Sequence, residues 1–365
     1  MREREKMLNT PMYVFDATEL KRNYSRMKGL IKDTSIYYTL KANSNYKVIS
    51  VLKDFCDGFE VSSKGEYDIL KKFDLREKNI ICSLPIKPLE WIEYLNSYGC
   101  NYFVFDSCEE LYKIVNFAPT SKKILRLSVT DISEKSIEFG MQYEEIINRI
   151  SDYKFNNLID GLTFHISDNN DIEIFNRTFD RIESICKRMV RNDIIINIGG
   201  GYRLNAPDEF YDNLNMRLSK LRSVKNVRFI AEPGNDIVNS AGKVYTKVIG
   251  KKTNVNGYVD LYIDYGKPSG FKTDSKRVPS TVINLSQKQI SNIDGKKYRF
   301  IDITCMHKPH FNKFLNFDIA VGDILEFGDM GAYTLCLRSD FHAWEAPYVE
   351  IVNAYASNVE LKSKF

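Results

Sequence analysis

Up to about residue 235 the chain alternates between short apolar runs and amphipathic stretches. Runs of four to eight apolar residues bounded by polar ones are typical of buried strands, and apolar residues three or four apart indicate helices. The predicted strands are Ile36–Leu40, Gly58–Val61, Asn79–Cys82, Tyr102–Phe105, Ile124–Leu127, Gly161–Phe164, Ile194–Ile198 and Val227–Ala231. The predicted helices include Lys47–Phe55, Lys64–Phe73, Leu89–Ser97, Ser107–Asn116 and Ile172–Val190. Eight apolar strands alternating with helices predict a parallel (β/α)8 barrel of the TIM type.

Beyond Gly234 the pattern changes to Val, Ile, Thr and Tyr runs separated by Gly, Asn, Asp and Pro. The predicted strands there are Val244–Ile249, Val259–Ile263, Arg299–Thr304 and Ile324–Phe327. This texture favours an antiparallel sandwich or barrel, which the early strand Pro11–Phe15 could join. We therefore predict two domains, a barrel over residues 25–235 and a β domain built from residues 1–24 and 236–365.

Composition and charge narrow the classes of protein to be considered. The chain has 365 residues, 43% of them hydrophobic, and a formal net charge of +4, which predicts a globular protein without a nucleic-acid partner. No apolar run approaches 18 residues and the opening Met1–Lys6 alternates in charge, so we expect neither a membrane span nor a signal peptide, and a cytoplasmic location. The seven cysteines are scattered and are expected to be reduced.

Polar residues whose side chains could take part in catalysis or binding follow the predicted strands. In a TIM barrel the carboxyl ends of the strands build the active site, so these residues are expected to share one mouth. They are Lys41, Glu60, Arg126, His165, the triplet Gly199, Gly200 and Gly201, and Glu232. Taken singly, each has an ordinary structural explanation, such as a surface lysine, a hydrogen-bonded histidine or a left-handed glycine turn.

Together these residues match the needs of pyridoxal phosphate. A buried lysine can form a Schiff base, amides of a glycine loop at a helix start can hold a phosphate, and an acid can keep a pyridine nitrogen protonated. Convergence on one mouth is what favours this interpretation over the separate structural ones.

The order of these motifs resembles the barrel-type (fold type III) pyridoxal-phosphate-dependent decarboxylases, which include ornithine, diaminopimelate, arginine and carboxynorspermidine decarboxylases. The resemblance rests on motifs spread over nearly the whole chain. They are Thr10–Phe15, Tyr38–Asn43, Glu60–Ser63, Glu138–Gly140, Phe164–His165, Ile198–Gly201, Ala231–Gly234, Cys305 and Gly328–Thr334. It implies the two-domain architecture of alanine racemase, and an enzyme that decarboxylates an amino acid.

The resemblance also implies a role for each residue. Lys41 looks like the Schiff-base lysine, Glu232 like the partner of the pyridine nitrogen, and His165 like the residue against the ring face. The amides of Gly199, Gly200 and Gly201 and the side chain of Tyr333 would hold the phosphate, while Arg126 and Glu60 would line the pocket. Cys305 resembles the cysteine that enters the neighbouring subunit's site and reprotonates the substrate, which implies a homodimer with shared active sites.

One segment departs from this family in a way that affects the substrate. Family members that act on diamino acids usually carry an acid directly after the cysteine, whereas here Met306, His307 and Lys308 follow Cys305. A partly cationic segment would repel an ammonium group, so we expect a substrate with a neutral or acidic distal end, including a conjugated or carrier-bound amino acid. Asp264 lies near a second acidic position of the family and could still bind an amine, which leaves an ordinary diamino-acid decarboxylase as the alternative.

Two further departures concern anions and metals. Asn235 and Asp168 replace an arginine and a serine that usually lie near the cofactor phosphate, so we expect this contact to be rearranged. No metal site is predicted, because Pro309 interrupts the spacing of His307 and His310 and no further ligand set is evident. A histidine pair that lines an anion pocket fits this segment better.

Two other functions remain open. A non-catalytic homologue could keep the fold and bind a partner, although retention of the candidate residues argues against it. A racemase on the same barrel would share the first chemical steps, and measured release of CO2 would distinguish it from a decarboxylase.

Overall fold

The computed structural model describes residues 9–73, 75, 79–133, 138–166, 171–271, 279–285, 295–305 and 309–354. None of the helices within those ranges is long and apolar enough to cross a membrane. Contacts between Cα atoms divide the chain into two compact units. One comprises Met1–Arg22, Ala42–Val51 and Ile237–Phe365, and the other comprises Asn23–Lys41 and Leu52–Asp236. We call them the β unit and the barrel unit.

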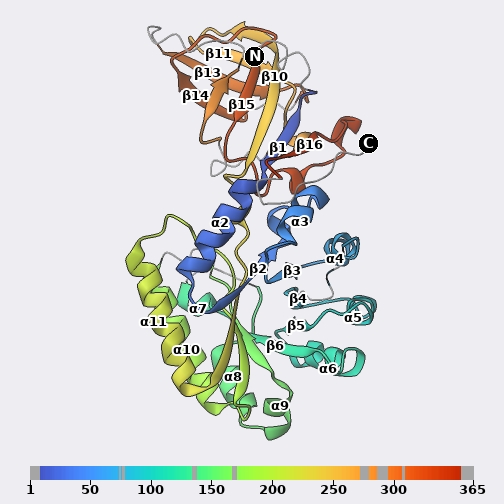
Figure 1. Ribbon diagram of the computed structural model, residues 1–365, viewed down its shortest axis with the longest axis vertical. Helices are drawn as coiled ribbons and strands as arrows, with labels where there is room; N and C mark the ends of the chain where they lie inside the picture. The colour runs from blue at the N-terminus through green and yellow to red at the C-terminus, as the bar shows by residue number, and fades with distance from the viewer. Residues whose placement is uncertain are drawn as a thin grey trace, which may run out of the picture. The chain divides into compact units, whose positions relative to one another are not determined.

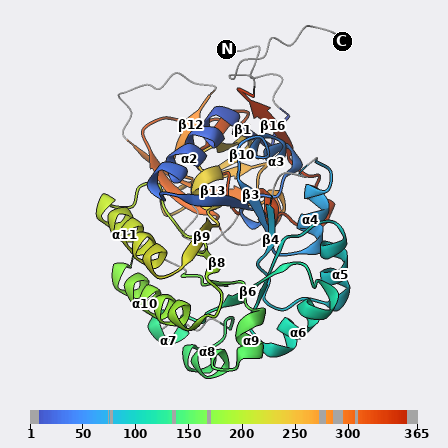
Figure 2. The same cartoon turned by 60° about the horizontal axis from the view of Figure 1, so that its bottom comes forward.

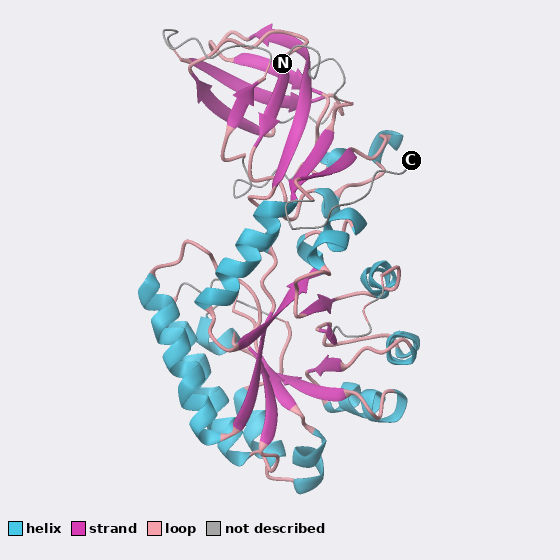
Figure 3. Ribbon diagram, viewed as in Figure 1, coloured by secondary structure: helices cyan, strands magenta, loops and turns pink. Residues whose placement is uncertain are grey.

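The barrel unit is a closed ring of parallel strands, β2 to β9, in which each strand pairs with the next and β9 returns to β2 (Figure 1; Figure 3). The strands are β2 (Thr34–Thr39), β3 (Gly58–Val61), β4 (Asn79–Cys82), β5 (Tyr102–Phe105), β6 (Lys122–Arg126), β7 (Gly161–Thr163), β8 (Asp193–Asn197) and β9 (Asn226–Ala231). The eight predicted runs are these eight strands, and the predicted (β/α)8 barrel is confirmed.

Helices α4 to α11 lie outside the ring of strands, as Figure 2 shows. They are α4 (Lys64–Leu70), α5 (Leu89–Ser97), α6 (Cys108–Phe117), α7 (Thr130–Ser133), α8 (Tyr143–Ile150), α9 (Tyr153–Leu158), α10 (Ile172–Arg188) and α11 (Asp208–Val224). Several begin at a side chain that accepts a hydrogen bond from the first turn, namely Ser63, Ser107 and Asp171. Such N-caps satisfy amide groups that a helix start leaves unpaired, so they fix where each helix begins after its strand.

The inside of the ring is filled by apolar and aromatic side chains. Its buried cluster comprises Tyr37, Ile81, Tyr102, Val104, Ile124, Ile195 and Ile230. These residues come from six of the eight strands, so the barrel centre is a packed core and not a channel. The space for chemistry is therefore confined to the ends of the strands.

Short helical segments contain the boundaries between the two units. They are α2 (Ala17–Leu30), η1 (Leu40–Ala42), α3 (Tyr46–Leu52) and α12 (Asn235–Val238). Lys41 is the last residue of its segment of the barrel unit, and the next segment, Ala42–Val51, belongs to the β unit.

The β unit is an eight-stranded sheet with the order β12-β15-β10-β11-β13-β14, to which β1 is added through β10 and β16 through β1. The strands are β1 (Met12–Asp16), β10 (Gly242–Thr253), β11 (Val259–Ile263), β12 (Val282–Asn284), β13 (Lys296–Asp302), β14 (Phe311–Leu315), β15 (Ile324–Phe327) and β16 (Tyr348–Val352). Its remaining helical turns are η2 (Lys267–Ser269), η3 (Leu335–Leu337) and η4 (Phe341–Ala343).

This sheet is mixed, whereas we expected an antiparallel one. β11 pairs with β13 in parallel, and β1 pairs with β16 in parallel, while the other pairs are antiparallel. Each parallel pair joins strands separated by a long stretch of chain, which gives the backbone room to return in the same direction. Composition and alternation identify a strand but carry no information on its direction, so the sequence patterns could not reveal this.

Candidate active site

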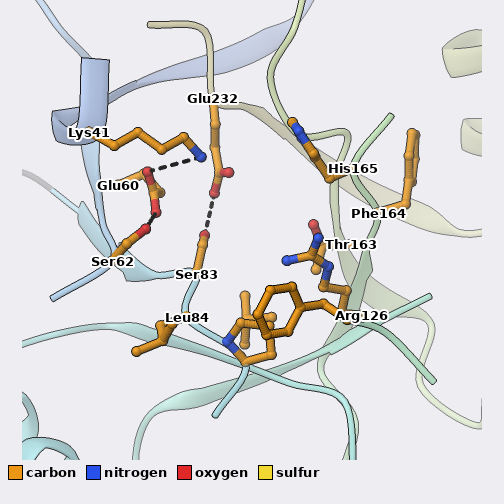
Figure 4. A pocket seen from close by; sticks show the side chains of 13 residues that line it. Lys41, Glu60, Ser62, Ser83, Leu84, Arg126, Thr163, Phe164, His165 and Glu232 are labelled. Carbon is orange, nitrogen blue, oxygen red and sulfur yellow. Dashed lines mark hydrogen bonds and ion pairs between the residues drawn. The ribbon is translucent and has the colours of Figure 1, made fainter. Parts of the chain in front are cut away.

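A cavity of about 230 Å3 opens at the carboxyl ends of the barrel strands (Figure 4). Lys41 follows β2, Glu60 lies in β3, Arg126 ends β6, His165 follows β7 and Glu232 follows β9. The complete lining is Lys41, Glu60, Ser62, Ser83, Leu84, Pro85, Val104, Arg126, Phe139, Thr163, Phe164, His165 and Glu232. The five predicted side chains therefore do share one cavity, as the strand-end rule required.

Lys41 faces a fully buried carboxylate. Its Nζ lies 4.0 Å from Oε2 of Glu60, whose side chain is 0% exposed. Glu60 also accepts hydrogen bonds from the hydroxyl groups of Thr39 and Ser62, the latter at 2.6 Å. In Figure 4 the amine of Lys41 points toward the carboxyl groups of Glu60 and Glu232. These donors hold Glu60 in place, so the position of the lysine amine is defined by a fixed negative charge.

Glu232 is a buried acid held by two neutral donors. Its Oε1 accepts hydrogen bonds from Oγ of Ser83 at 2.7 Å and from Nδ2 of Asn197 at 2.6 Å. The pKa of Glu232 is raised to about 7, chiefly by burial and also by the nearby charge of Glu60, while Lys41, Ser83 and Asn197 act in the opposite direction. Its carboxyl group is thus poised to hold or release a proton near neutral pH.

His165 and Arg126 lie in the same cavity. The pKa of His165 is lowered to about 4, chiefly by burial and also by the positive charges of Lys41 and Arg126. Burial also lowers the pKa of Arg126, against the opposing charges of Glu232, Asp106 and Glu60. His165 is therefore a neutral ring at pH 7, suited to packing against another ring, whereas Arg126 remains a cation.

The glycine triplet serves a tight meeting of strand ends. A Cβ atom on Gly199 would lie 2.6 Å from the carbonyl oxygen of Phe164, and one on Gly200 would lie 2.5 Å from that of Glu232. Gly199 and Gly201 have φ angles of 68° and 92°, which favour glycine. The amide of Gly199 donates to Oδ1 of Asn197 at 2.9 Å, so that donor is already engaged.

The loop does not lie at a helix start, contrary to our expectation. The next helix, α11, begins only at Asp208, after Pro207. Any anion held at Gly200 or Gly201 would therefore meet loop amides and not a helix N-terminus. The backbone of Gly201 is exposed, which leaves room for such a contact.

Three further groups at the site were not predicted from the sequence. Ser83 and Asn197 bind Glu232, and Glu66 lies in α4 with a carboxylate that accepts the amide of Ser62 at 2.6 Å. The pKa of Glu66 is raised to about 7, chiefly by burial and also by the nearby charge of Glu60. Ser83 directly follows the third predicted strand, so the rule that identified Lys41 could have found it. Asn197 ends β8 as Arg126 ends β6, so the same rule could have found it too, whereas Glu66 lies within a helix, where no such rule applies.

Apart from Asn235, which begins α12 in the barrel unit, the remaining predicted residues belong to the β unit or lie outside the described residues. The backbone amide of Tyr333 donates to the carbonyl of Ala42 at 2.7 Å within the β unit, and Cys305 is exposed with a φ angle of 58°. Their roles remain predictions. Met306, His307, Lys308 and Asp168 lie outside the described residues.

Asp264 is part of a hydrogen-bond network inside the β unit. Its Oδ1 accepts hydrogen bonds from Oγ1 of Thr246 at 2.7 Å and from the amide of Lys247 at 2.9 Å. Its Oδ2 accepts one from Oγ1 of Thr10 at 2.6 Å. Both carboxylate oxygens thus have partners within the unit.

His310 does not line an anion pocket, contrary to our expectation. Its Nε2 lies 3.0 Å from Oδ2 of Asp302, both side chains are buried, and its ring packs 4.5 Å from that of Phe271. A carboxylate beside the imidazole repels an anion, so this histidine belongs to the core of the β unit. Among the residues the structure describes, no group of three or more His, Cys, Asp or Glu side chains could hold a metal ion.

The fold and the cavity together define a class of enzyme. A lysine amine, a buried acid with a raised pKa, a neutral histidine ring and an exposed glycine turn fit a cofactor with an aldehyde, a ring nitrogen and a phosphate. The cavity, together with the glycine turn that follows β8, thus has the donor set that pyridoxal phosphate needs, on a TIM-type barrel.

Comparison with known proteins identifies the family. Residues 17–239 match the family described as pyridoxal-dependent decarboxylase, pyridoxal binding domain. The chain therefore belongs to the pyridoxal-dependent decarboxylases, and it is a carboxy-lyase that uses pyridoxal 5'-phosphate. It is 26% identical over 351 residues to ornithine decarboxylase of Schizosaccharomyces pombe, covering 91% of this chain and 81% of that protein. It is 24% identical over 364 residues to lysine/ornithine decarboxylase of Selenomonas ruminantium, covering 93% and 88%.

Solved structures share the fold of the chain. Arginine decarboxylase of Paramecium bursaria Chlorella virus aligns with a TM-score of 0.87 and 21% identity, covering 96% of this chain and 98% of that one. Lysine/ornithine decarboxylase of Vibrio vulnificus, complexed with putrescine, aligns with a TM-score of 0.83 and 22% identity, covering 97% of both chains. The architecture of a barrel followed by a β domain is therefore that of solved decarboxylases.

Proposed function

We propose that this decarboxylase acts on an amino acid, or an amino-acid conjugate, whose distal group is neutral or acidic, and that its role is biosynthetic. The observation that carries the decarboxylation chemistry is the gathering of Lys41, His165 and Glu232 in one cavity at the strand ends. The inference on the distal group rests on the run Cys305–Lys308, which contains no acid.

Each residue of the cavity has a part in this proposal. When bound, pyridoxal phosphate supplies an electron sink for the bond that breaks at the substrate Cα. Lys41 would bind the cofactor and exchange a proton with the substrate amine, while Glu232 would keep the ring nitrogen protonated. His165, a neutral ring, would pack against the cofactor, and Arg126 and Glu60 would line the pocket beside it. Gly200, Gly201 and Tyr333 would hold the phosphate.

Decarboxylation at Cα requires one proton. The bond between Cα and the carboxylate breaks, CO2 leaves, and a proton takes its place at Cα. We assign that proton to the thiol of Cys305, which is exposed in the β unit. Exposure is compatible with a role in a neighbouring subunit's site, which would make a homodimer the catalytic unit.

An exposed apolar segment of the β unit supports an assembly of two copies. Leu337, Phe341, Trp344 and Tyr348 are 48%, 47%, 37% and 55% exposed within twelve consecutive residues. Apolar side chains concentrated on one surface segment are typical of an interface. Mixing Lys41→Ala with Cys305→Ala subunits should restore activity if sites are shared, whereas no restoration would contradict a shared site.

Asp264 bears on the distal group. Because its two oxygens already accept three hydrogen bonds, its capacity to bind a substrate ammonium is reduced. This supports a neutral or acidic distal end over a second ammonium. The relatives named ornithine and lysine/ornithine decarboxylase favour the alternative, an ordinary diamino-acid decarboxylase.

Release of CO2 from a panel of substrates tests the proposal. The panel comprises ornithine, lysine, diaminopimelate, glutamate and acylated diamino acids, each with the protein loaded with cofactor. We expect turnover of the acidic or acylated members and little of the free diamino acids. Robust turnover of a free diamino acid would establish the alternative, and loss of optical activity without CO2 would indicate a racemase.

A further inference from the structure

A buried lysine lies behind one wall of the cavity. The side chain of Lys87, in the loop between β4 and α5, is 0% exposed. Its Nζ donates to the carbonyl oxygens of Leu84 at 2.8 Å, Pro85 at 3.3 Å and Val104 at 2.6 Å, and lies 2.8 Å from Oε1 of Glu110. An ammonium buried without such partners would be too costly to keep charged, so its partners are essential to its presence here.

A second set of contacts holds this lysine from its other side. Oε1 of Glu110, in the first turn of α6, accepts the backbone amide of Lys87 at 3.1 Å. The ammonium of Lys113 pairs with the other oxygen of Glu110 and donates to the carbonyl of Lys87 at 2.7 Å. Two ammonium groups and one carboxylate therefore fix the β4–α5 loop against helix α6. Satisfied buried networks of this kind are rigid.

The carbonyl groups that Lys87 binds belong to the cavity wall. Leu84, Pro85 and Val104 all line the cavity, and Ser83, the residue before Leu84, donates its hydroxyl to Glu232 at 2.7 Å. The backbone of Ser83 is held at its other side by the carbonyl of Val61 at 3.1 Å. A path of two residues thus joins the buried ammonium to the hydroxyl that binds the catalytic acid.

We propose that Lys87, held by Glu110, is a positioning residue for the reaction, which fixes the Ser83–Pro85 wall so that Ser83 keeps its hydrogen bond to Glu232. This inference rests on the proposed function, because it assumes that Glu232 partners the cofactor. Lys87 does not line the cavity and acts through the backbone of Leu84 and Pro85.

The Lys87→Met variant tests this assignment, since it keeps an apolar stem of similar length but removes the donors. Ser83 should then lose its fixed position, and Glu232 should lose a hydrogen bond that favours its charged form. We expect the Kd for pyridoxal phosphate to rise about tenfold at pH 7, the usual cost of one hydrogen bond to a charged group. Affinity should fall as the pH is lowered and Glu232 takes up a proton, and the midpoint of this fall should rise by about one pH unit. Both are measured by titrating cofactor-free protein and following the absorbance of the lysine-bound cofactor.

Two further variants separate positioning from simple loss of stability. Ser83→Ala should produce the same shift in the pH dependence, and the double variant Lys87→Met with Ser83→Ala should shift it no further, since both act on one hydrogen bond. The matched control is Lys123→Met. Lys123 is also buried and donates to two carbonyl groups, those of Pro119 at 2.6 Å and Ser121 at 2.5 Å, but it lies at the amino end of β6. This control should lower stability without moving the pH dependence.

The outcomes are distinguishable. Unchanged affinity and pH dependence in Lys87→Met, or additive shifts in the double variant, would overturn the positioning role. If Lys87→Met does not fold, the same titration of the milder Glu110→Gln variant decides, with a shift in the same direction supporting the role and no shift overturning it. A wild-type protein that never binds the cofactor through lysine would overturn the proposed function itself, and the inference with it.

Discussion

The two ends of the barrel both carry polar side chains, but they satisfy them differently. At the amino end, Arg228 of β9 donates one hydrogen bond to the hydroxyl of Tyr37 and one to that of Tyr102, both at 2.9 Å. The start of β6 is held by Asp160, whose carboxylate accepts hydrogen bonds from the amide of Lys123 at 2.9 Å and from the ammonium of Lys122 at 3.2 Å. Arg228 and Lys122 there both meet acceptors, so this end is built for stability.

At the carboxyl end, burial shifts the pKa values of charged groups more than their hydrogen bonds and ion pairs do. The pKa values of Glu66 and Glu232 are each raised to about 7 and that of His165 is lowered to about 4, in every case chiefly by burial. Charge in this cavity is therefore held at a cost in stability, which a bound cofactor and substrate would offset. The comparison shows that the two ends differ in whether the protein itself completes the polar contacts. Substitutions at the carboxyl end should lower the rate of CO2 release, and those at the amino end should lower the free energy of unfolding.

Lys41→Ala is expected to have the largest effect on the carboxyl end. Without the amine no covalent link to the cofactor can form, so CO2 release should fall on the order of a thousandfold or more. The absorbance band of lysine-bound pyridoxal phosphate should also disappear, which a spectrum of the purified variant records.

The matched control for Lys41 is at the opposite end of the barrel. Lys122→Ala removes an ammonium that is half-exposed and pairs with Asp160. It should keep the absorbance band and nearly full CO2 release. A Lys41→Ala protein that retains the band, or a Lys122→Ala protein that loses it, would contradict the division between the two ends.

Glu232→Gln should separate activity from stability. Loss of the acid that partners the ring nitrogen should lower CO2 release about a hundredfold or more. The raised pKa of Glu232 means that its contribution to stability is fully present below its unfolded value and is lost as the pH rises through about 7. At pH 8 the cofactor-free Gln variant should therefore be more stable than wild type, by up to about 3 kcal/mol. Denaturant unfolding at pH 8 measures this.

A buried acid of the β unit provides the comparison for Glu232. Glu326 accepts hydrogen bonds from the ammonium of Lys243 at 2.7 Å and the hydroxyl of Tyr245 at 2.6 Å. Because its charge is paired, Glu326→Gln should lower stability at pH 8 and not raise it. If both Gln variants change stability in the same direction, the lack of a close ammonium partner for its buried charge is not what distinguishes Glu232 from Glu326.

Arg228→Met tests the amino end. Two buried tyrosine hydroxyls would lose their donor, which should lower the free energy of unfolding by about 2 kcal/mol. The kcat of the cofactor-loaded protein should stay close to wild type, because Arg228 does not line the cavity. Thermal unfolding and CO2 release, measured on one preparation, test both statements, and a large fall in kcat with unchanged stability would contradict them.

The sequence predicted the barrel well because its signal is local. Each strand of a parallel barrel is buried on both faces, so runs such as Ile194–Ile198 are apolar except for Asn197 and correspond to strands within one or two residues. The β unit was less predictable. Its strands were identified, but the parallel pairings of β11 with β13 and β1 with β16 depend on long-range contacts that no local pattern encodes.

The site was predictable to the same extent as the fold that carries it. Lys41, Arg126, His165 and Glu232 were found because they follow or end strands, and closure of the ring brings strand ends together. Lys87 and Glu110 could not be found in this way, since a buried ion pair looks like two surface charges in the sequence. Only the folded structure shows which charged residues are buried.

The smallest of the predicted effects is a pH dependence due to His165. Its pKa lies at about 4 when folded and at about 6.5 when unfolded, so its contribution to stability is present above pH 6.5 and is lost as the pH falls through 4. Between pH 6.5 and 5.5 this single group should lower the stability of cofactor-free wild type by about 1 kcal/mol relative to His165→Gln. Denaturant unfolding of both proteins at the two pH values measures the difference, in which the other titrating groups cancel. The exposed His342 is the matched control, because His342→Gln should follow the wild type at both pH values. Equal loss of stability in wild type and His165→Gln would show that this imidazole is not held neutral by burial, and that the carboxyl end is more solvated than its cavity suggests.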